Sequence, residues 1–190
     1  MSFGYPSSPS RREALNLIIG SLIVWIVGIT WIGYFSTTGL LINSVLFILA
    51  FILHEYAHKI SAIRNGLYAE FRVQWIWAIL TLVTAFLPFK IIAPGATVVY
   101  GFADDETMGK ISAWGPIVNL IMAVILLPLA LFRYSFLFTA VYFNSFIALF
   151  NLLPVAILDG RKVFRGSKKI WGIMFLTSGI LYIIFWLPEI

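Results

Sequence analysis

Residues 47–64 read FILAFILHEYAHKISAIR, and they place His54, Glu55 and His58 inside a run that is apolar enough to cross a membrane. Because residues four apart share one face of an α-helix, His54 and His58 can bind one metal ion while Glu55 lies beside it as a general base. This is the HExxH pattern of a zinc site. A polar cluster facing water at a helix end is the alternative, but ionisable groups within a membrane span are costly and indicate function.

The composition of the chain is that of a polytopic membrane protein. Of its 190 residues, 61% are hydrophobic and 11% are charged, with a mean hydropathy of +0.98, which lies outside the range of soluble domains. At about 20 residues per span, we expect an all-α membrane protein of five to six transmembrane helices. It would form one transmembrane domain over 13–190, behind a disordered cytoplasmic tail over 1–12. The absence of Cys excludes thiolate metal sites and thiol catalysis.

The Lys and Arg residues predict how the spans are oriented. Arg11 and Arg12 precede the first span, and a basic run over 161–169 precedes the last. The positive-inside rule places both groups in the cytoplasm, on the inner side of a prokaryotic cell membrane. No basic patch is interleaved with stacking aromatics, so the charge indicates orientation and not nucleic-acid binding. This arrangement requires five crossings, predicted over 14–34, 40–63, 110–132, 136–153 and 170–187.

The helix rise predicts the depth of the metal site. His54 follows Leu40, the start of the second span, by about 21 Å at about 1.5 Å per residue. In a hydrocarbon core about 30 Å thick, this places the site in the cytoplasmic half of the lipid bilayer.

The segment between the second and third spans predicts a short β-hairpin or re-entrant region. Residues 68–74 alternate as a strand does, and 90–101 read as strand, Pro-Gly turn, strand. Residues 75–88 are apolar but too few for a full crossing, so we expect a re-entrant or buried helix. Irregular backbone at membrane depth needs a cover of protein or a water-filled cavity, which an active site would supply. The acids over 104–106 are expected to cap the next helix, with a cation site as the alternative.

The third metal ligand follows by elimination. A catalytic zinc usually takes three protein ligands, and because no further His and no Cys exists, the third must be a carboxylate. Asp159 ends an apolar stretch behind Pro154, on the same side as the His pair, which makes it the best candidate. Because Pro154 interrupts the helix, 155–158 are expected to be extended, with Asp159 and Gly160 turning the chain. A simple Asp-Gly turn without a bound metal is the alternative to the ligand role. The other acids lie at terminal membrane edges, beside basic residues or in the loop after the hairpin: Glu13, Glu189, Glu70, Asp104, Asp105 and Glu106.

Within the third span, Gly115 and Asn119 share one helix face. A glycine there would let this helix approach a neighbour closely, and the asparagine would offer it an amide. Ordinary packing of small residues is the alternative.

Three segments in this order resemble the signatures of the site-2 protease family of intramembrane zinc metalloproteases. They are HEYAH at 54–58, WGPIVN at 114–119 and NLLPVAILDG at 151–160, and the resemblance covers about 40–165. It implies a minimal form without PDZ or CBS domain that cleaves a transmembrane helix of a membrane-protein substrate, in regulated intramembrane proteolysis. Many members read Asp-Gly-Gly where this chain has Asp159, Gly160 and Arg161, a departure that removes no ligand.

The resemblance also implies the role of each site residue. One catalytic Zn²⁺ would be held by His54, His58 and Asp159, with Glu55 as the general base of peptide hydrolysis. Asn151 and Asn119 match polar residues near the metal or substrate and could donate to the developing oxyanion. An edge strand over 68–74 or 96–100 could hold the unwound substrate by β-augmentation.

Two alternatives to this function stay open at the level of the sequence. A different membrane zincin acting on soluble or prenylated peptides would need a downstream glutamate ligand, and no mid-chain candidate exists. A catalytically silent scaffold, or a proton-coupled transporter, could use the same polar residues as a relay. Stoichiometric zinc in the purified protein would distinguish a metalloprotease from a scaffold or transporter, because a proton relay requires no zinc.

Overall fold

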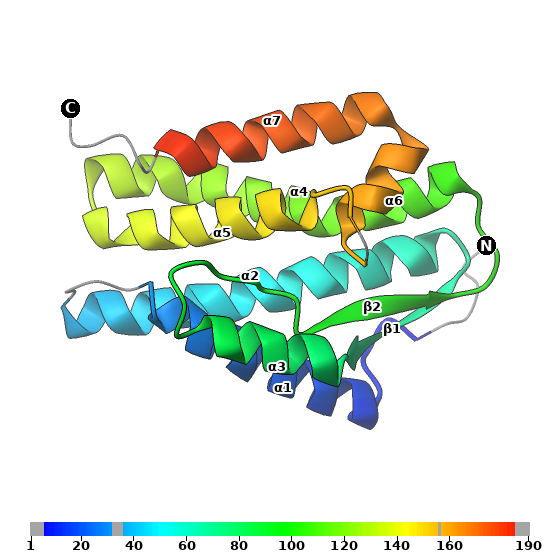
Figure 1. Cartoon of the computed structure of the whole chain (residues 1–190), viewed down its shortest axis with the longest axis horizontal. Coiled ribbons are helices and arrows are strands. Elements are labelled where there is room, and N and C mark those ends of the chain that lie inside the picture. Colours follow the sequence, from blue (N-terminus) through cyan, green and yellow to red (C-terminus); the bar gives the residue numbers. More distant parts are fainter. Residues whose placement is uncertain (1–5, 32–35, 156, 185–190) are drawn as a thin grey trace.

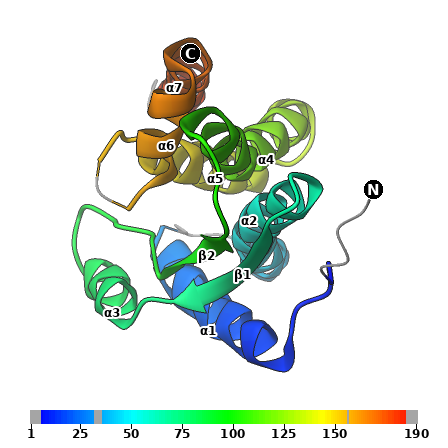
Figure 2. The same ribbon diagram turned by 90° about the vertical axis from the view of Figure 1, so that its right-hand side faces the viewer.

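In the computed structural model, which describes residues 6–31, 36–155 and 157–184, apolar helices surround a small two-stranded sheet. The central helix α2 separates two groups of elements: α1, α3 and the sheet lie on one side of it, and α4 to α7 on the other (Figures 1 and 2). The elements in chain order are α1 (Arg11–Ile29), α2 (Thr37–Arg64), β1 (Tyr68–Val73), α3 (Trp75–Thr84), β2 (Gly95–Tyr100), α4 (Asp105–Phe132), the 3₁₀ turn η1 (Ser135–Leu137), α5 (Phe138–Asn151), α6 (Asp159–Gly166) and α7 (Lys168–Ile184).

Local signals set where the long helices begin and end. Ser10, Ser36 and Asp104 are the N-caps of α1, α2 and α4, and each side chain accepts a backbone N–H from the first turn of its helix. The capping role expected for the acids at 104–106 is thereby confirmed. Gly66, with a φ of 77°, follows α2 and ends it, because glycine adopts this left-handed conformation without strain.

Among the described residues, three helices are long and apolar enough to cross a membrane: α1, α2 and α4. The 10-residue α3 is about 15 Å long, half of a hydrocarbon core of about 30 Å. The stretch Ser135–Asn151 and the 17-residue α7 are shorter than the three spans, so helix length does not confirm five to six crossings. The tail expected over 1–12 ends earlier, because α1 begins at Arg11. Residues 1–5 of that tail, and 185–187 of the last expected span, lie outside the described residues.

The β-hairpin lies between the second and third spans, as expected, and its strands fall within the predicted 68–74 and 90–101, but the first of the two strands predicted within 90–101 does not form. β1 pairs antiparallel with β2, from Tyr68 opposite Tyr100 to Val73 opposite Gly95, and α3 lies in the connection. Pro94 does not turn the chain, because its carbonyl accepts the N–H of Gln74 and so continues the pairing. One face of β1, which includes Ala69 and Phe71, is buried against α1 and α2.

The segment before Asp159 also differs from the expectation. α5 ends at Asn151, and the following residues form turns and bends where an extended stretch was predicted; residue 156 lies outside the described residues. Asp159 does not turn the chain but begins the short helix α6. The physical reason is that this segment is amphipathic: Gly160 and Val163 are buried while Arg161 and Arg165 are exposed, and an acid in the first turn favours the helix dipole.

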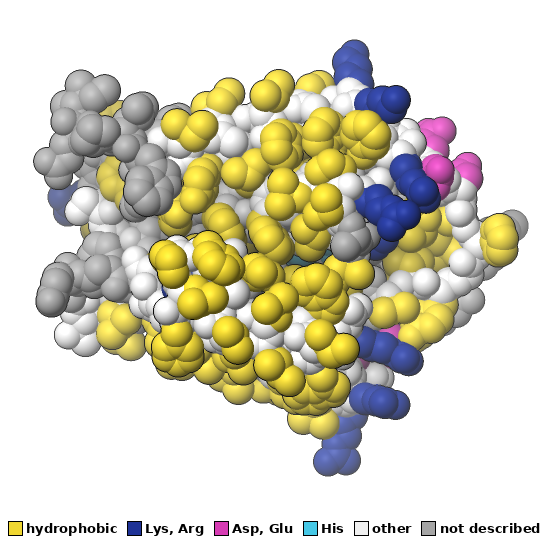
Figure 3. All heavy atoms as spheres, in the orientation of Figure 1, with side chains coloured by type: hydrophobic (Ala, Val, Ile, Leu, Met, Phe, Trp, Pro, Cys, Tyr) yellow, Lys and Arg dark blue, Asp and Glu magenta, His cyan; other side chains and the backbone are white. Residues whose placement is uncertain are grey.

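The core of the molecule and the outer face of its helices are both apolar. Phe47 and Phe51 of α2 pack with Phe143 of α5 in one buried cluster. Gly20 and Gly28 of α1 face these two α2 rings, so the two helices approach closely. Hydrophobic side chains also cover the outer face of the helices, while Lys and Arg gather at one end, to the right in Figure 3. This distribution is consistent with a membrane protein.

Candidate metal centre

The two histidines of α2 converge on Asp159 of α6. His54 and His58 lie one turn apart, both are buried, and their Nε2 atoms are 3.1 Å apart. Oδ2 of Asp159 lies 3.3 Å from Nε2 of His54 and 3.0 Å from Nε2 of His58. Among the described residues, these three form the one group of His and acidic side chains close enough to hold a metal ion. The three ligands expected from the sequence therefore meet at one point.

The triangle formed by these three atoms has the size of a zinc site. Ligands at about 2.0–2.1 Å from a tetrahedral Zn²⁺ lie about 3.3 Å from one another. The three measured separations are 3.0, 3.1 and 3.3 Å, and the donor set of two imidazoles and one carboxylate is typical of catalytic zinc. The residues present thus fit a zinc ion, with one coordination position left over.

Hydrogen bonds at the far side of each ring fix which nitrogen faces the metal position. Nδ1 of His54 lies 2.6 Å from Oδ1 of Asn119, and Nδ1 of His58 lies 3.0 Å from the carbonyl oxygen of Ile111. Both partners are acceptors, so each Nδ1 carries the proton and donates it. The lone pair of each Nε2 is then directed at the metal position, an arrangement that orients ligands and raises their basicity.

The two asparagines identified from the sequence occupy different places. Asn119 is fully buried, and its Nδ2 donates to the carbonyl oxygen of Ala50 and to Oδ1 of Asn144. It therefore lies behind His54, with its donors directed into the bundle. Asn151 lines the cavity beside the metal ligands, and its Nδ2 donates to the carbonyl oxygen of Ile147.

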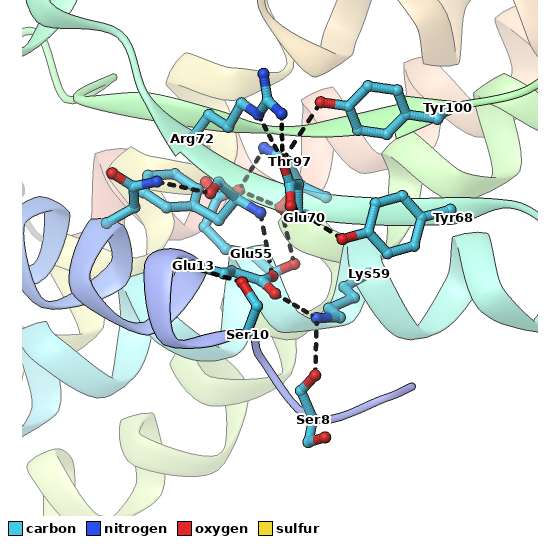
Figure 4. Close-up of polar contacts among 12 residues, drawn as sticks. Ser8, Ser10, Glu13, Glu55, Lys59, Tyr68, Glu70, Arg72, Thr97 and Tyr100 are labelled. Carbon is cyan, nitrogen blue, oxygen red and sulfur yellow. Dashed lines mark hydrogen bonds and ion pairs between the residues drawn. The ribbon is translucent and has the colours of Figure 1, made fainter. Parts of the chain in front are cut away.

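Glu55 contacts the sheet through a residue that sequence reasoning missed. Its Oε2 accepts both the backbone N–H of Thr97, at 3.0 Å, and the Thr97 hydroxyl, at 2.8 Å (Figure 4). Thr97 lies in β2, 42 residues from Glu55. Only the position of β2 against α2 brings the two together, so no spacing in the sequence pointed to Thr97.

The cavity at the metal ligands is small. Its volume is about 30 Å³, which holds one or two water molecules and no peptide. It lies between β2 on one side and the start of α6 on the other. Its lining residues are His54, Glu55, His58, Ala93, Gly95, Ala96, Thr97, Asn151, Ile157, Leu158, Asp159 and Lys162.

One curated relative extends over nearly the whole chain. The chain is 31% identical over 189 residues to a protein of Methanocaldococcus jannaschii named "Putative zinc metalloprotease", and the alignment covers 93% of this chain and 97% of that protein. No protein-family model and no solved structure matches the chain.

Proposed function

The chain belongs to the same zinc metalloprotease family as this M. jannaschii protein, and on that premise we propose that it is a site-2 protease-like enzyme that cleaves peptide bonds of membrane proteins within the bilayer. The observation that carries the proposal is the convergence of His54, His58 and Asp159, with Glu55 beside them, among helices that are apolar enough to span a membrane. In the proposed topology, 135–151 and α7 also cross, which gives five spans with the N-terminus and the site on the cytoplasmic side.

A bound zinc ion supplies Lewis acidity, which activates a water molecule and polarises the scissile carbonyl. Glu55 accepts a proton from that water, and the water oxygen bonds to the carbonyl carbon. Glu55 then delivers the proton to the leaving nitrogen as the C–N bond breaks. Asn119 holds the His54 ring in its orientation, and Asn151, at the cavity wall, donates to the substrate backbone or the developing oxyanion.

The substrate must be an unwound segment, because a helix satisfies and hides its own peptide groups. The sheet offers one edge for it. The Phe71 N–H on the outer edge of β1 donates to Glu13 of α1, and the Phe71 carbonyl accepts from Asn16 of the same helix. The outer edge of β2 lines the cavity through Gly95 and Thr97. This arrangement favours strand addition at β2 over β1.

A proton relay or a silent scaffold gains no support from this geometry. A relay needs no ligand triangle of zinc dimensions, and the family to which the chain belongs is one of zinc metalloproteases.

The decisive experiment compares the wild type with Glu55→Gln. Each purified protein is assayed for zinc by mass spectrometry and incubated with a panel of transmembrane segments, with and without a chelator. We expect one zinc per chain in both proteins, chelator-sensitive cuts by the wild type, and a rate lower by about 10²–10⁴ in the variant, since it lacks the general base. Full activity of Glu55→Gln, or cleavage that persists without zinc, would contradict the proposal.

A further inference from the structure

The two outer edges of the sheet are capped by carboxylates at the same position along the strands. Phe71 of β1 lies opposite Thr97 of β2. The N–H of Phe71 donates to Oε1 of Glu13, and the N–H of Thr97 donates to Oε2 of Glu55. Opposed residues of an antiparallel pair either exchange both hydrogen bonds or direct both outward, so this pair is of the outward type. Each carboxylate therefore occupies the place that a third strand would take.

The two carboxylates that cap the sheet edges, Glu13 and Glu55, differ in the other contacts that hold them. Glu13 also bonds Nζ of Lys59 at 2.5 Å, and both of these side chains are buried (Figure 4). This ion pair holds the Glu13 carboxylate that closes the β1 edge. Among the hydrogen bonds of the described residues, those of the Glu55 carboxylate come from Thr97 alone. The β2 edge is thus closed only by the residue that must act as the general base.

We propose that Thr97 is a positioning residue that holds Glu55 in a resting place, and that a substrate strand pairing with β2 releases it. This inference rests on the proposed proteolytic function and concerns its control. A strand added to β2 needs the outward N–H of Thr97 for one of its own carbonyl oxygens. Taking that donor leaves Oε2 of Glu55 with the Thr97 hydroxyl as its one remaining partner, which weakens the hold on the carboxylate and lets it turn toward the water whose proton it accepts. Chain segments that cannot form a strand leave the base held.

The small cavity supports a closed resting state. Its volume of about 30 Å³ leaves no room for a strand between β2 and the start of α6, so a substrate must part these elements as it enters. The release of Glu55 is then part of the same step, because the strand that opens the cavity is the one that takes the Thr97 N–H.

The test uses Thr97→Val, which removes the hydroxyl bond to Glu55 but keeps the shape of the side chain and the backbone N–H. Two substrates are compared: a transmembrane segment that the wild type cuts, and the same segment with one N-methylated residue next to the cut, which blocks strand pairing. We expect wild-type kcat to fall on the methylated segment. In Thr97→Val, kcat on the methylated segment should recover by about tenfold, which is the effect of one hydrogen bond to a charged group. The KM for this segment should stay high, because strand pairing with β2 is still blocked.

Two variants serve as controls. Thr97→Ser keeps the hydroxyl and should behave as the wild type. Thr139→Val changes a buried threonine of α5, about 18 Å along the helix from Asn151, and should have no effect. If Thr97→Val does not retain zinc, Thr97→Ala takes its place with the same expectation.

The outcomes separate the two proposals. A Thr97→Val variant that cuts both segments more slowly, or that leaves kcat on the methylated segment unchanged, overturns the release of Glu55 but leaves the proteolytic function intact. A wild type that cuts no segment in a zinc-dependent way contradicts the proteolytic function itself.

Discussion

At the scale of single residues, the metal centre depends as much on the neighbours of the ligands as on the ligands. His54 and His58 present Nε2 because Asn119 and the Ile111 carbonyl accept from Nδ1. Both acceptors belong to α4, so this helix orients the imidazoles that α2 supplies. The sequence had indicated that Asn119 shares a face with Gly115, and the structure shows what that face packs against.

Gly115 is the residue where a single methyl group should displace the metal. A Cβ built there lies 2.6 Å from Nε2 of His54, and closer still to Nε2 of His58. We expect Gly115→Ala to weaken zinc binding by about tenfold or more, since overpacking costs about 1–3 kcal/mol. Zinc titration of the purified variant measures this directly.

Gly172→Ala is the matched control for that change. Its Cβ meets nothing within 4 Å, and it lies in α7, away from the site. We expect unchanged zinc affinity in this variant. Equal affinities in Gly115→Ala and Gly172→Ala would show that α4 does not press on the metal position as described.

At the scale of elements, a buried ion pair fastens the sheet to the helix that carries the histidines. Glu13 lies in the first turn of α1, Lys59 follows His58 in α2, and Glu13 also accepts the N–H of Phe71 in β1. The three elements α1, α2 and β1 thus meet at one carboxylate. The position of β2, and with it the contact between Thr97 and Glu55, depends on this junction.

Removing only one partner of the Glu13–Lys59 ion pair should lower the free energy of unfolding. Lys59→Met leaves the Glu13 carboxylate buried without its cation, and we expect a loss of about 3–5 kcal/mol in the free energy of unfolding. The double variant Glu13→Gln with Lys59→Met should recover part of that loss, because no uncompensated charge remains. Denaturation of the detergent-solubilised protein, followed by intrinsic tryptophan fluorescence, provides the measurement.

The exposed pair of Lys110 and Glu106 is the control for this prediction. Its side chains are 58% and 68% exposed, so Lys110→Met should change stability by less than about 1 kcal/mol. A loss in Lys59→Met no larger than in Lys110→Met would mean that the junction does not hold the sheet.

At the scale of the whole molecule, the proposed orientation requires that residues 135–151 cross the membrane. This stretch is 17 residues long, or about 25 Å as a helix, which is near the lower limit for a span. It joins Arg133, at the end of α4, to the basic residues around α6. In the proposed orientation the larger basic group around α6 is cytoplasmic by the positive-inside rule, and Arg133 then lies on the outer side.

Single cysteines test this crossing, because the chain contains none of its own. Arg133 and Lys169 are both exposed. A membrane-impermeant maleimide should label Arg133→Cys in intact cells and Lys169→Cys only in inverted vesicles. Labelling of both from the same side would contradict the crossing and the five-span orientation.

The sequence by itself determined the composition of the bundle and identified the residues of the candidate metal centre. The spacing of His54 and His58 is a local property of one helix, and Asp159 followed because so few other ligands exist in the chain. The helix caps at Asp104 and Gly66 were likewise predictable, since they depend on neighbouring residues alone.

Only the tertiary structure decided how distant segments meet. The pairing of β1 with β2 across α3, the start of α6 at Asp159, and the contact between Thr97 and Glu55 all depend on packing between elements far apart in the chain. Local periodicity carries no information on such register, because a strand or a short helix gains most of its stability from the surface against which it packs. The stretch over residues 47–64 therefore specified the ligands, and the elements packed around it determined their geometry.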